Sequence, residues 1–493
     1  MVVDTRVATT ATIENRISGR LVAARDGAWF EKLNPHNATL SARVARSNAS
    51  DVRDAVAAAR GAFIDWAGTP PVQRGEVLRA VCAGMRGRRE ELARVVTRET
   101  GKSPASALGE VDGAILLGEF FAGEGQRLFG RTMTSATPHR YNYTTRQPIG
   151  VAGLIVPANT PIANVAWKTF PALICGNTAV LKSAEDSPET AAVFACIAEE
   201  SGLPPGVLNI VHGLGQEAGA ALVLHPDVGV LSFTGSTAVG RQIAVVAAQR
   251  LARVSLELGG KNPFVVCDDA DLENAAKWAT LSAFSNAGQR CAAGSRVIVF
   301  DKVYDRFRAM LVERARALKI GPTDADDFGP VINERQLANV LRFIDEAKSA
   351  GAVIVTGGAR LTDAPHRDGY YLEPTIIEGA AADAPISCSE LFGPVTVLYR
   401  AAGFEDALAL ANASPYGLTA CIHTANVHRS LEFTQRVEAG IAVVNAGTYG
   451  SEPHMPFGGV KASGNGSREP GTEALDVYST LKNMIFVADP TRL

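Results

Sequence analysis

The sequence predicts an α/β protein that contains two parallel β-sheets covered by helices. Short apolar stretches such as residues 151–156, 178–181 and 228–233 alternate with helical stretches, which is the pattern of strand–helix–strand units in a parallel sheet. A second series of this kind begins at residues 263–266, and 493 residues are too many for one compact core. We therefore expect two domains that meet near residues 257–263.

Capping residues and hydrophobic periodicity predict the elements that precede the first sheet. A ragged strand is expected at residues 27–35. Ser50 is a good N-cap for a helix over residues 51–66, whose apolar side chains recur on one face. A second helical stretch is predicted over residues 71–100, and it ends at Gly101 because glycine adopts the left-handed cap conformation at little cost.

The remaining elements are expected to follow the two series along the chain. An extended, β-like segment over residues 141–150 precedes the first series. Further helices and strands are predicted at residues 162–175, from 187 onward, and at 207–211, 237–251, 296–300, 304–318 and 395–399. The chain has no internal repeat and no low-complexity linker.

Composition and charge argue against two classes of partner. A hydrophobic content of 46% with 20% charged residues is ordinary for a globular protein, and a formal net charge of −3 provides no electrostatic basis for binding nucleic acid or a membrane surface. The densest basic cluster, Arg86, Arg88 and Arg89, is followed by Glu90 and Glu91. That mixture indicates a solvated helix face.

The cysteines and the N-terminal residues predict a cytoplasmic protein. Seven cysteines, at positions 82, 175, 196, 267, 291, 388 and 421, lie far apart and include no Cys-x-x-Cys pair, so we expect neither a disulfide framework nor a metal site. The N-terminus has no signal-peptide pattern, and no stretch reaches the roughly 18–20 apolar residues of a membrane span.

Two turns are candidates for binding the phosphates of a dinucleotide. The segment Gly213-x-Gly215-x-x-Ala218 follows a predicted strand and matches the Gly-x-Gly-x-x-Gly/Ala fingerprint, although such glycines often form only a tight bend. The segment Phe233-Thr-Gly-Ser236 ends the next strand and opens a helix, where backbone N–H groups and a serine hydroxyl can bind an anion. A third glycine segment, Gly101-Lys-Ser103, resembles the end of a P-loop. We reject that interpretation because the required glycine is replaced by Val96.

Two further segments contain residues that are suited to catalysis. In Glu257-Leu-Gly-Gly-Lys261 the paired glycines indicate either a backbone that another group approaches closely or a domain hinge. Cys291 lies among small and polar residues and is a candidate nucleophile, although most single cysteines are buried and inert. No histidine lies in this segment, so a base of another type would be needed.

These segments, in this order, resemble the aldehyde dehydrogenase superfamily over almost the whole chain, from Asn34 to the region of Phe486. Several independent motifs in the family's order are far more specific than any one of them. The motifs are Pro157-Ala-Asn159, Leu181-Lys-Ser-Ala-Glu185, Phe233–Ser236, Glu257–Lys261, Gly288-Gln-Arg-Cys291, Glu390-Leu-Phe-Gly-Pro394 and Pro456-Phe-Gly-Gly459.

The resemblance implies the aldehyde dehydrogenase fold. It assigns residues 1–128 and 149–257 to a Rossmann-like NAD(P)-binding domain and residues 258–459 to an α/β catalytic domain. Residues 129–148 and 477–493 would form a β arm that joins subunits, so a homodimer or homotetramer is implied.

The resemblance also implies the reaction, which is the oxidation of a small-molecule aldehyde to a carboxylic acid with NAD, or alternatively NADP. Cys291 would form a thioester, Asn159 would stabilise the oxyanion, and Glu257 would activate the water that hydrolyses the thioester. A carboxylate at position 257 favours release of the free acid. The residues implied in cofactor binding are Ile155, Val156, Lys182, Glu185, Gly215, Gly219, Phe233, Gly235, Ser236, Leu258, Glu390 and Phe392.

Departures from the common family pattern concern the substrate. Ala158-Asn-Thr160 replaces the usual Trp-Asn-Phe, and Arg290 precedes the nucleophile, as in semialdehyde and phosphorylated-aldehyde members. The C-terminal segments 450–459 and 463–469 resemble those of ketoglutarate-semialdehyde-type members. Arg290 would pair with an anionic tail, or alternatively serve as a structural salt-bridge partner that faces away from the pocket. Thr160, Trp167 and Tyr449 are further candidate substrate residues.

We therefore predict a dehydrogenase for a small anionic aldehyde or semialdehyde. One alternative is a broad-specificity aliphatic or aromatic aldehyde dehydrogenase. Another, from a different class, is a catalytically silent structural protein on the same fold, against which the intact Cys291, Glu257 and Asn159 argue.

Overall fold

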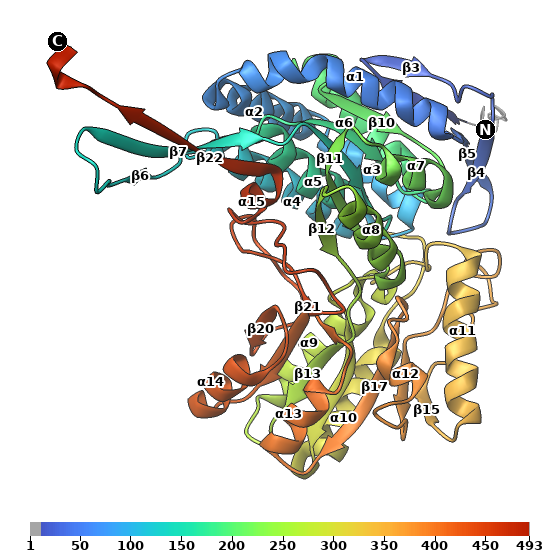
Figure 1. Ribbon diagram of the computed structural model, residues 1–493. Coiled ribbons are helices and arrows are strands. Elements are labelled where there is room, and N and C mark those ends of the chain that lie inside the picture. Colours follow the sequence, from blue (N-terminus) through green and yellow to red (C-terminus); the bar gives the residue numbers. More distant parts are fainter. Residues whose placement is uncertain (1–10, 493) are drawn as a thin grey trace.

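The computed structural model describes residues 11–492 and contains two seven-stranded sheets and a projecting three-stranded arm (Figure 1). The first sheet has the order β12-β11-β8-β9-β10-β2-β3, with its first five strands parallel. Its strands are β12 (Arg253–Glu257), β11 (Val228–Thr234), β8 (Val151–Ile155), β9 (Thr178–Lys182), β10 (Leu208–Val211), β2 (Asn15–Ile17) and β3 (Arg20–Val22).

Helices cover both faces of the first sheet, which explains why its central strands are apolar throughout rather than alternating. Ala152 and Leu154 of β8 face one cluster of helices, while Val151 and Ile155 face the other. The first cluster contains α2 (Pro71–Gly87), α3 (Arg89–Thr100), α4 (Pro104–Glu124), α5 (Pro161–Ile174), α6 (Pro188–Glu200) and α15 (Ala474–Tyr478). The second contains α1 (Ala49–Gly68), α7 (Ala220–Leu224) and α8 (Thr237–Gln249).

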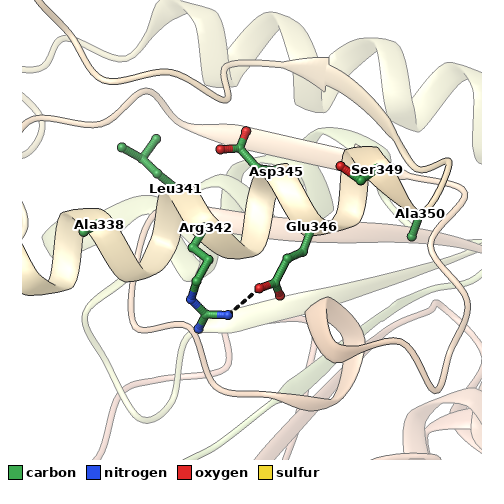
Figure 2. A pocket seen from close by; sticks show the side chains of 7 residues that line it. All are labelled: Ala338, Leu341, Arg342, Asp345, Glu346, Ser349 and Ala350. Atoms are coloured by element: carbon green, nitrogen blue, oxygen red, sulfur yellow. Dashed lines mark hydrogen bonds and ion pairs between the residues drawn. The ribbon is translucent and has the colours of Figure 1, made fainter.

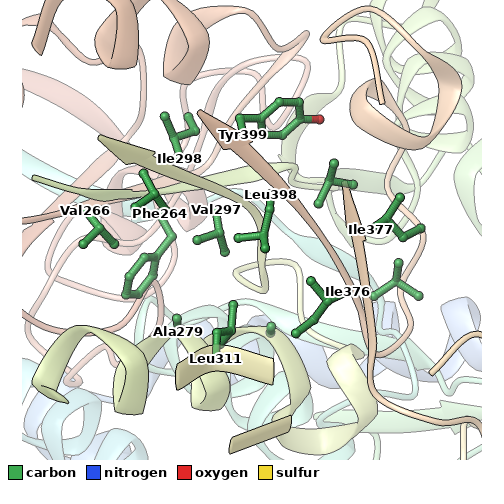
Figure 3. Packing of buried hydrophobic residues seen from close by; sticks show 14 of the residues in the cluster. Phe264, Val266, Ala279, Val297, Ile298, Leu311, Ile376, Ile377, Leu398 and Tyr399 are labelled. Atoms are coloured by element: carbon green, nitrogen blue, oxygen red, sulfur yellow. The ribbon is translucent and has the colours of Figure 1, made fainter. Parts of the chain in front are cut away.

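The second sheet has the order β15-β16-β17-β14-β13-β19-β20 and is parallel except for β15. Figure 3 shows Phe264, Val297 and Leu398 pointing from three adjacent strands toward Ala279 and Leu311 of the helices below them. The strands are β15 (Val353–Thr356), β16 (Thr375–Glu378), β17 (Val395–Ala401), β14 (Gly294–Phe300), β13 (Asn262–Val266), β19 (Thr419–His423) and β20 (Ile441–Val444). The helices of this half are α9 (Leu272–Phe284), α10 (Asp301–Ala317), α11 (Glu334–Ser349), α12 (Pro385–Cys388), α13 (Phe404–Asn412) and α14 (Val427–Arg436).

A three-stranded antiparallel arm projects from the body of the molecule (Figure 1). In it β22 (Ser479–Val487) pairs over its whole length with β7 (Arg140–Pro148), and the short β6 (Thr132–Met133) flanks β7. The aromatic rings of Tyr143 and Phe486 stack 5.6 Å apart across the pair. The smaller elements are β1 (Ala11–Ile13), β4 (Trp29–Leu33), β5 (Leu40–Ala45), β18 (Tyr416–Gly417), β21 (Val460–Lys461), η1 (Gly215–Gly219), η2 (Ser285–Gly288) and η3 (Pro490–Arg492).

Two helix boundaries differ from the prediction. The first helix is capped by Asn48 and not by Ser50, because the Asn48 side chain accepts from the Ser50 N–H at 2.8 Å and the Asp51 carboxylate accepts from the Asn48 N–H at 2.8 Å, which completes a capping box. The stretch predicted as one helix over residues 71–100 is two helices that break at Arg88, where φ is −115° and ψ is 27°.

Several other predictions are confirmed. Helix α3 ends at Gly101, whose φ of 75° is the left-handed conformation expected of a glycine cap. The strand expected at residues 27–35 is β4, which is shorter than predicted. All seven cysteines are free thiols.

Candidate active site

The site begins at the carboxyl ends of the parallel strands in the first sheet. Thr234 of β11 pairs with Glu257 of β12, Phe233 pairs with Ile155 of β8, and Ile155 pairs with Lys182 of β9. These residues therefore form a row along one edge, which is where open α/β sheets bind ligands. Val156, Glu185 and the turn after β10 continue from the same strand ends.

The amino ends of the second sheet face this row. Residues 258–261 connect the end of β12 directly to β13, and Asn262 at the start of β13 pairs with Gly294 at the start of β14. The Asn262 side chain donates to the carbonyl oxygens of Cys291 and Ala293, each at 2.8 Å. This places Cys291 between the two sheets.

The backbone before Cys291 is unusual for L residues. Asn286, Ala287 and Gly288 have φ values of 55°, 53° and 66°, so three consecutive residues are left-handed. Non-glycine residues in this region carry strain of about 1–3 kcal/mol each, and such strain is concentrated at functional sites. A side chain at Gly288 would overlap with the Gly393 carbonyl group, so this loop packs directly on the Glu390–Pro394 segment.

Asn159 is tied to the Cys291 loop. Its side-chain amide donates to the Gln289 carbonyl oxygen at 3.0 Å, and its own carbonyl oxygen accepts from the Asn286 amide at 3.3 Å. The Gln289 side chain accepts from the Ile332 N–H at 2.8 Å, which anchors the loop to the second half of the chain. The structure thus brings Asn159, predicted from a distant motif, beside the candidate nucleophile.

Two cavities meet at Cys291. The first, here called the Glu257 cavity, has a volume of about 350 Å³. The second, the Arg290 cavity, has a volume of about 550 Å³. Five residues line both cavities: Asn159, Thr160, Trp167, Cys291 and Phe457. Cys291 therefore lies on the boundary between the two cavities.

The Glu257 carboxyl group lines the first cavity and has no partner. The residue is 3% exposed, and neither carboxyl oxygen has a hydrogen-bond partner among residues 11–492. Burial and the neighbouring Glu469 raise its pKa well above the usual range, although Lys168 and Arg468 oppose the shift. A shift in this direction makes the ionised form of Glu257 a stronger proton acceptor than an exposed carboxylate.

The Cys291 thiol is neutral in this environment. Burial, followed by the nearby Glu390 and Glu257 carboxyl groups, raises its pKa to about 12, while the Ala292 N–H and Arg290 act in the opposite direction. A thiolate must therefore form during the reaction, with a base to take the proton.

The paired glycines after Glu257 are closely approached and do not form a free hinge. The Gly260 N–H donates to Glu390 Oε1 at 3.0 Å. A side chain at Gly259 would overlap with the Glu390 carboxylate, and one at Gly260 would overlap with the Cys291 carbonyl oxygen. Burial raises the pKa of Glu390 to about 7, although the Gly260 N–H and Lys261 lower it.

The two candidate phosphate turns differ in structure. Gly215–Gly219 forms a π-helical turn before the five-residue α7, and the Gly215 N–H donates to Glu185 Oε1 at 2.6 Å. The fingerprint segment therefore opens a helix whose first turn is π-helical, and the Gly215 N–H is already bound to Glu185. Gly235 and Ser236 instead line the Glu257 cavity, where Ser236 caps α8 by accepting from the Val239 N–H at 3.5 Å.

The remaining candidate cofactor residues fall into two groups. Leu258, Glu390 and Phe392 line the Glu257 cavity together with Gly235 and Ser236. The others lie along the strand-end row or in the turn after β10, outside that cavity: Ile155, Val156, Lys182, Glu185, Gly215, Gly219 and Phe233. Lys182 Nζ lies 3.4 Å from Glu185 Oε1, so these two and Gly215 form one cluster.

Arg290 faces the second cavity. Its guanidinium lies 4.8 Å from the centroid of the Tyr449 ring, and its buried Nε has no hydrogen-bond partner in the described part of the chain. No carboxylate forms an ion pair with Arg290 among residues 11–492, so the geometry disfavours a structural salt bridge. Thr160, Trp167 and Tyr449 line the same cavity.

Sequence reasoning missed several residues that line the cavities, of which four make contacts that bear on the site. Gln336 donates to the Phe392 carbonyl oxygen at 2.9 Å, and Phe457 packs edge-to-face on Trp167 with ring centroids 5.1 Å apart. Lys102 and Glu110 line the Arg290 cavity. Phe457 belongs to a motif that was recognised, whereas Gln336 lies on α11, where no local pattern indicates a function.

A separate shallow depression lies on the solvent-facing side of α11 (Figure 2). It is formed by one helix face, where Arg342 and Glu346 form an ion pair at 2.6 Å. It shares no residue with the two cavities. Within the described residues, no helix is long and apolar enough to cross a membrane, and no group of His, Cys, Asp or Glu side chains could hold a metal ion.

Comparison with known proteins gives a consistent result. The model of the aldehyde dehydrogenase family matches residues 21–484. The chain is 39% identical to an alpha-ketoglutaric semialdehyde dehydrogenase of Bacillus subtilis over 97% of this chain and 98% of the relative. It is also 39% identical to an alpha-ketoglutarate semialdehyde dehydrogenase of Haloferax volcanii, over 96% and 98% of the two chains. The structure of a Staphylococcus aureus betaine aldehyde dehydrogenase in complex with NAD+ superposes with a TM-score of 0.94 at 32% identity, over 97% of this chain and 95% of that one.

Proposed function

The chain belongs to the aldehyde dehydrogenase family, and on that premise we propose that it oxidises a small anionic aldehyde to the free acid through a thioester on Cys291. Its activity class is the NAD(P)-dependent oxidation of aldehydes. The observation that carries the proposal is the meeting of two cavities at Cys291, with Glu257 on one side and Arg290 on the other.

We propose the following roles for the residues around the thiol. The Cys291 thiol loses its proton to solvent in the cavity, and the thiolate attacks the aldehyde carbon. The Asn159 amide donates to the developing oxyanion, an interaction typically worth ~3–4 kcal/mol. After oxidation leaves a thioester, Glu257 removes a proton from water, the hydroxide adds to the acyl carbon, and the C–S bond breaks to release the carboxylic acid.

A nicotinamide dinucleotide fits the residues of the Glu257 cavity and the strand-end row. It would supply the hydride acceptor, held by Gly235 and Ser236 at the start of α8 and by Glu390 and Phe392 near the thiol. Glu185 lies among the residues expected to contact the adenosine end, where a carboxylate would repel a 2′-phosphate. We therefore propose NAD as the preferred cofactor, with NADP as the alternative.

The proposed substrate charge rests on Arg290. A guanidinium that faces a cavity without a carboxylate partner is suited to bind the carboxylate, phosphate or sulfonate tail of an aldehyde. The names of the Bacillus and Haloferax relatives, both semialdehyde dehydrogenases, support this choice. The broad-specificity alternative retains one point in its favour, since a cavity of about 550 Å³ admits larger molecules.

We also propose the division of the chain and its assembly. Strand β12 closes one sheet at Glu257 and β13 belongs to the other, which supports a domain boundary at residues 257–258. The arm of β6, β7 and β22 exposes Leu481, Ile485 and Phe486, which supports its use in a homodimer or homotetramer. Seven free thiols fit a reducing cytoplasm.

A panel of aldehydes tests the proposal. Acidic and neutral aldehydes of equal chain length would be assayed by NADH absorbance with NAD and, separately, with NADP. We expect turnover with an acidic aldehyde and NAD, no turnover in Cys291→Ala, and unchanged NAD binding by that variant. Turnover retained in Cys291→Ala would refute the mechanism, and no turnover of any aldehyde by the wild type would favour the catalytically silent alternative.

A further inference from the structure

Gly101-Lys-Ser103 resembles the end of a P-loop, yet the structure gives Lys102 a different role. The Lys102 side chain is 2% exposed and forms an ion pair with Glu110, whose side chain is 6% exposed. The same ammonium group donates to the Asn159 carbonyl oxygen at 2.9 Å. Lys102 therefore connects helix α4 to the residue proposed as the oxyanion donor.

Glu110 has a second function in the same cluster. Its Oε1 accepts hydrogen bonds from the backbone N–H groups of Ile162 at 3.0 Å and Ala163 at 3.3 Å. These are N–H groups in the first turn of α5, and the N-cap residue Thr160 provides no side-chain cap of its own. The cap of α5 is thus supplied by a carboxylate from another helix, where a negative charge is favourable.

These contacts hold the chain on both sides of Thr160. The Asn159 carbonyl group is fixed by Lys102 and by Asn286, and the first turn of α5 is fixed by Glu110. A buried ion pair contributes little net stability compared with apolar packing of similar volume. Its contribution here is therefore geometric, because it orients the peptide that carries the Asn159 side chain.

We propose that the buried Lys102–Glu110 pair is a positioning unit that holds the Asn159 carboxamide in the orientation needed to stabilise the oxyanion at Cys291. This inference rests on the role proposed above for Asn159. Glu110 also neutralises Lys102, so Arg290 is the cation of the second cavity that lacks a carboxylate partner among the described residues. Lys102 and Glu110 act through Asn159 and are positioning residues.

A double-mutant cycle tests the proposal. The variants are Lys102→Met, Asn159→Ala and the combination of the two, and the measurement is the single-turnover rate of NADH formation. Asn159→Ala should lower this rate about 10²–10³-fold, as removal of an oxyanion donor does. Lys102→Met should lower it about 10- to 100-fold, because a displacement of about 1 Å costs that much, with KM for the aldehyde within about threefold of wild type.

The combined variant distinguishes positioning from a general structural effect. If Lys102 acts through Asn159, the combined variant should match Asn159→Ala within about twofold. Multiplied losses, or a wild-type rate in Lys102→Met, would overturn the proposal while leaving the role of Asn159 intact. A wild-type rate in Asn159→Ala would instead overturn the oxyanion assignment, and the positioning role with it.

Two further variants guard against misfolding. Glu110→Gln retains an oxygen that can accept from the Ile162 and Ala163 N–H groups but loses the charge. It should lower the single-turnover rate about fivefold in the wild-type background and should not lower it further in the Asn159→Ala background. Arg16→Met is a matched control, because it breaks a partly buried ion pair with Glu199, at 2.8 Å, that lies outside both cavities. Its single-turnover rate should be that of the wild type. Alkylation of Cys291 by iodoacetamide should stay within about twofold of wild type in Lys102→Met, since the pair orients Asn159 and not the thiol.

Discussion

Replacing Arg290 with alanine should reduce the activity with acidic aldehydes far more than the activity with neutral ones. The guanidinium faces the second cavity, stacks on Tyr449 at 4.8 Å, and has a buried Nε without an acceptor. A carboxylate tail that reaches this group would gain a charge-assisted hydrogen bond that requires no break in an existing ion pair. Such bonds contribute about 1.5–3 kcal/mol.

This energy converts into a measurable ratio of specificity constants. Since about 1.4 kcal/mol corresponds to a factor of ten, Arg290→Ala should lower kcat/KM for an acidic aldehyde roughly 10- to 150-fold. The assay compares succinic semialdehyde with butanal, which have the same chain length. The kcat/KM for butanal should change by less than about threefold, because butanal makes no bond to the guanidinium.

Two variants serve as controls for this result. Arg290→Lys retains the charge but loses the planar group that stacks on Tyr449, so it should give an intermediate loss. Arg342→Ala removes another arginine that lies over an aromatic ring, at 4.4 Å from Phe343, on the outer face of α11 (Figure 2). This variant should leave kcat/KM unchanged for both aldehydes. Equal losses for succinic semialdehyde and butanal in Arg290→Ala would refute the reasoning and favour the broad-specificity alternative.

Four further predictions concern the thiol, the base and the cofactor. Glu257→Gln should give a burst of NADH followed by slow turnover, and the absence of any thioester mass on Cys291 in the variant would contradict this role of Glu257. In the wild type, thioester hydrolysis should slow as the pH falls, because the pKa of Glu257 is raised and its basic form is lost on acidification. Because burial raises the pKa of Cys291 to about 12, the rate of its alkylation by iodoacetamide without cofactor should rise about tenfold per pH unit from about pH 7 to about pH 10. A plateau of this rate below about pH 9 would be inconsistent with a buried neutral thiol. The wild type should have a lower KM for NAD than for NADP, and Glu185→Ser should narrow that difference by removing the carboxylate; an unchanged ratio would assign Glu185 another role. Gly259→Ala should raise the KM for NAD, because the new methyl group would overlap with the Glu390 carboxylate. A normal KM would show that the Glu390 side chain can move freely.

Much of the fold could be predicted because its signals are local. Gly101 ends α3 through its own backbone preference, and the strands of the first sheet are recognisable as apolar runs because helices cover both of their faces. The break at Arg88 could not be predicted in the same way. The guanidinium of Arg88 pairs with Glu91 and also with Glu200 on α6, and the second of these contacts depends on the packing of helices that are far apart in the sequence.

The residue types needed for chemistry were also evident before their arrangement was known. Cys291 was a candidate from its own segment, the family resemblance implied Asn159 and Glu257 as its partners, and the paired glycines indicated either a close approach to the backbone or a hinge. The group that approaches Gly259 is Glu390, and no spacing along the chain reveals it. The partner of Lys102, Glu110, could not be predicted either, because no spacing along the chain reveals it. A lysine after a glycine is compatible with several functions.

The sequence by itself determined the α/β class, the strand-and-helix order and the side chains that carry the proposed reaction, because propensity, capping and motif identity act over a few residues. Only the tertiary structure decided that the carboxyl edge of one sheet faces the amino edge of the other, through the four residues 258–261, and that Cys291 lies where two cavities meet. The charge state of each group was likewise decided there. Cys291 is a neutral thiol, the pKa of Glu257 is raised, and Arg290 faces a cavity without a carboxylate partner among the described residues. These properties come from the groups that surround each side chain in space. Burial and Coulomb interactions depend on distance through the folded protein and not along the chain.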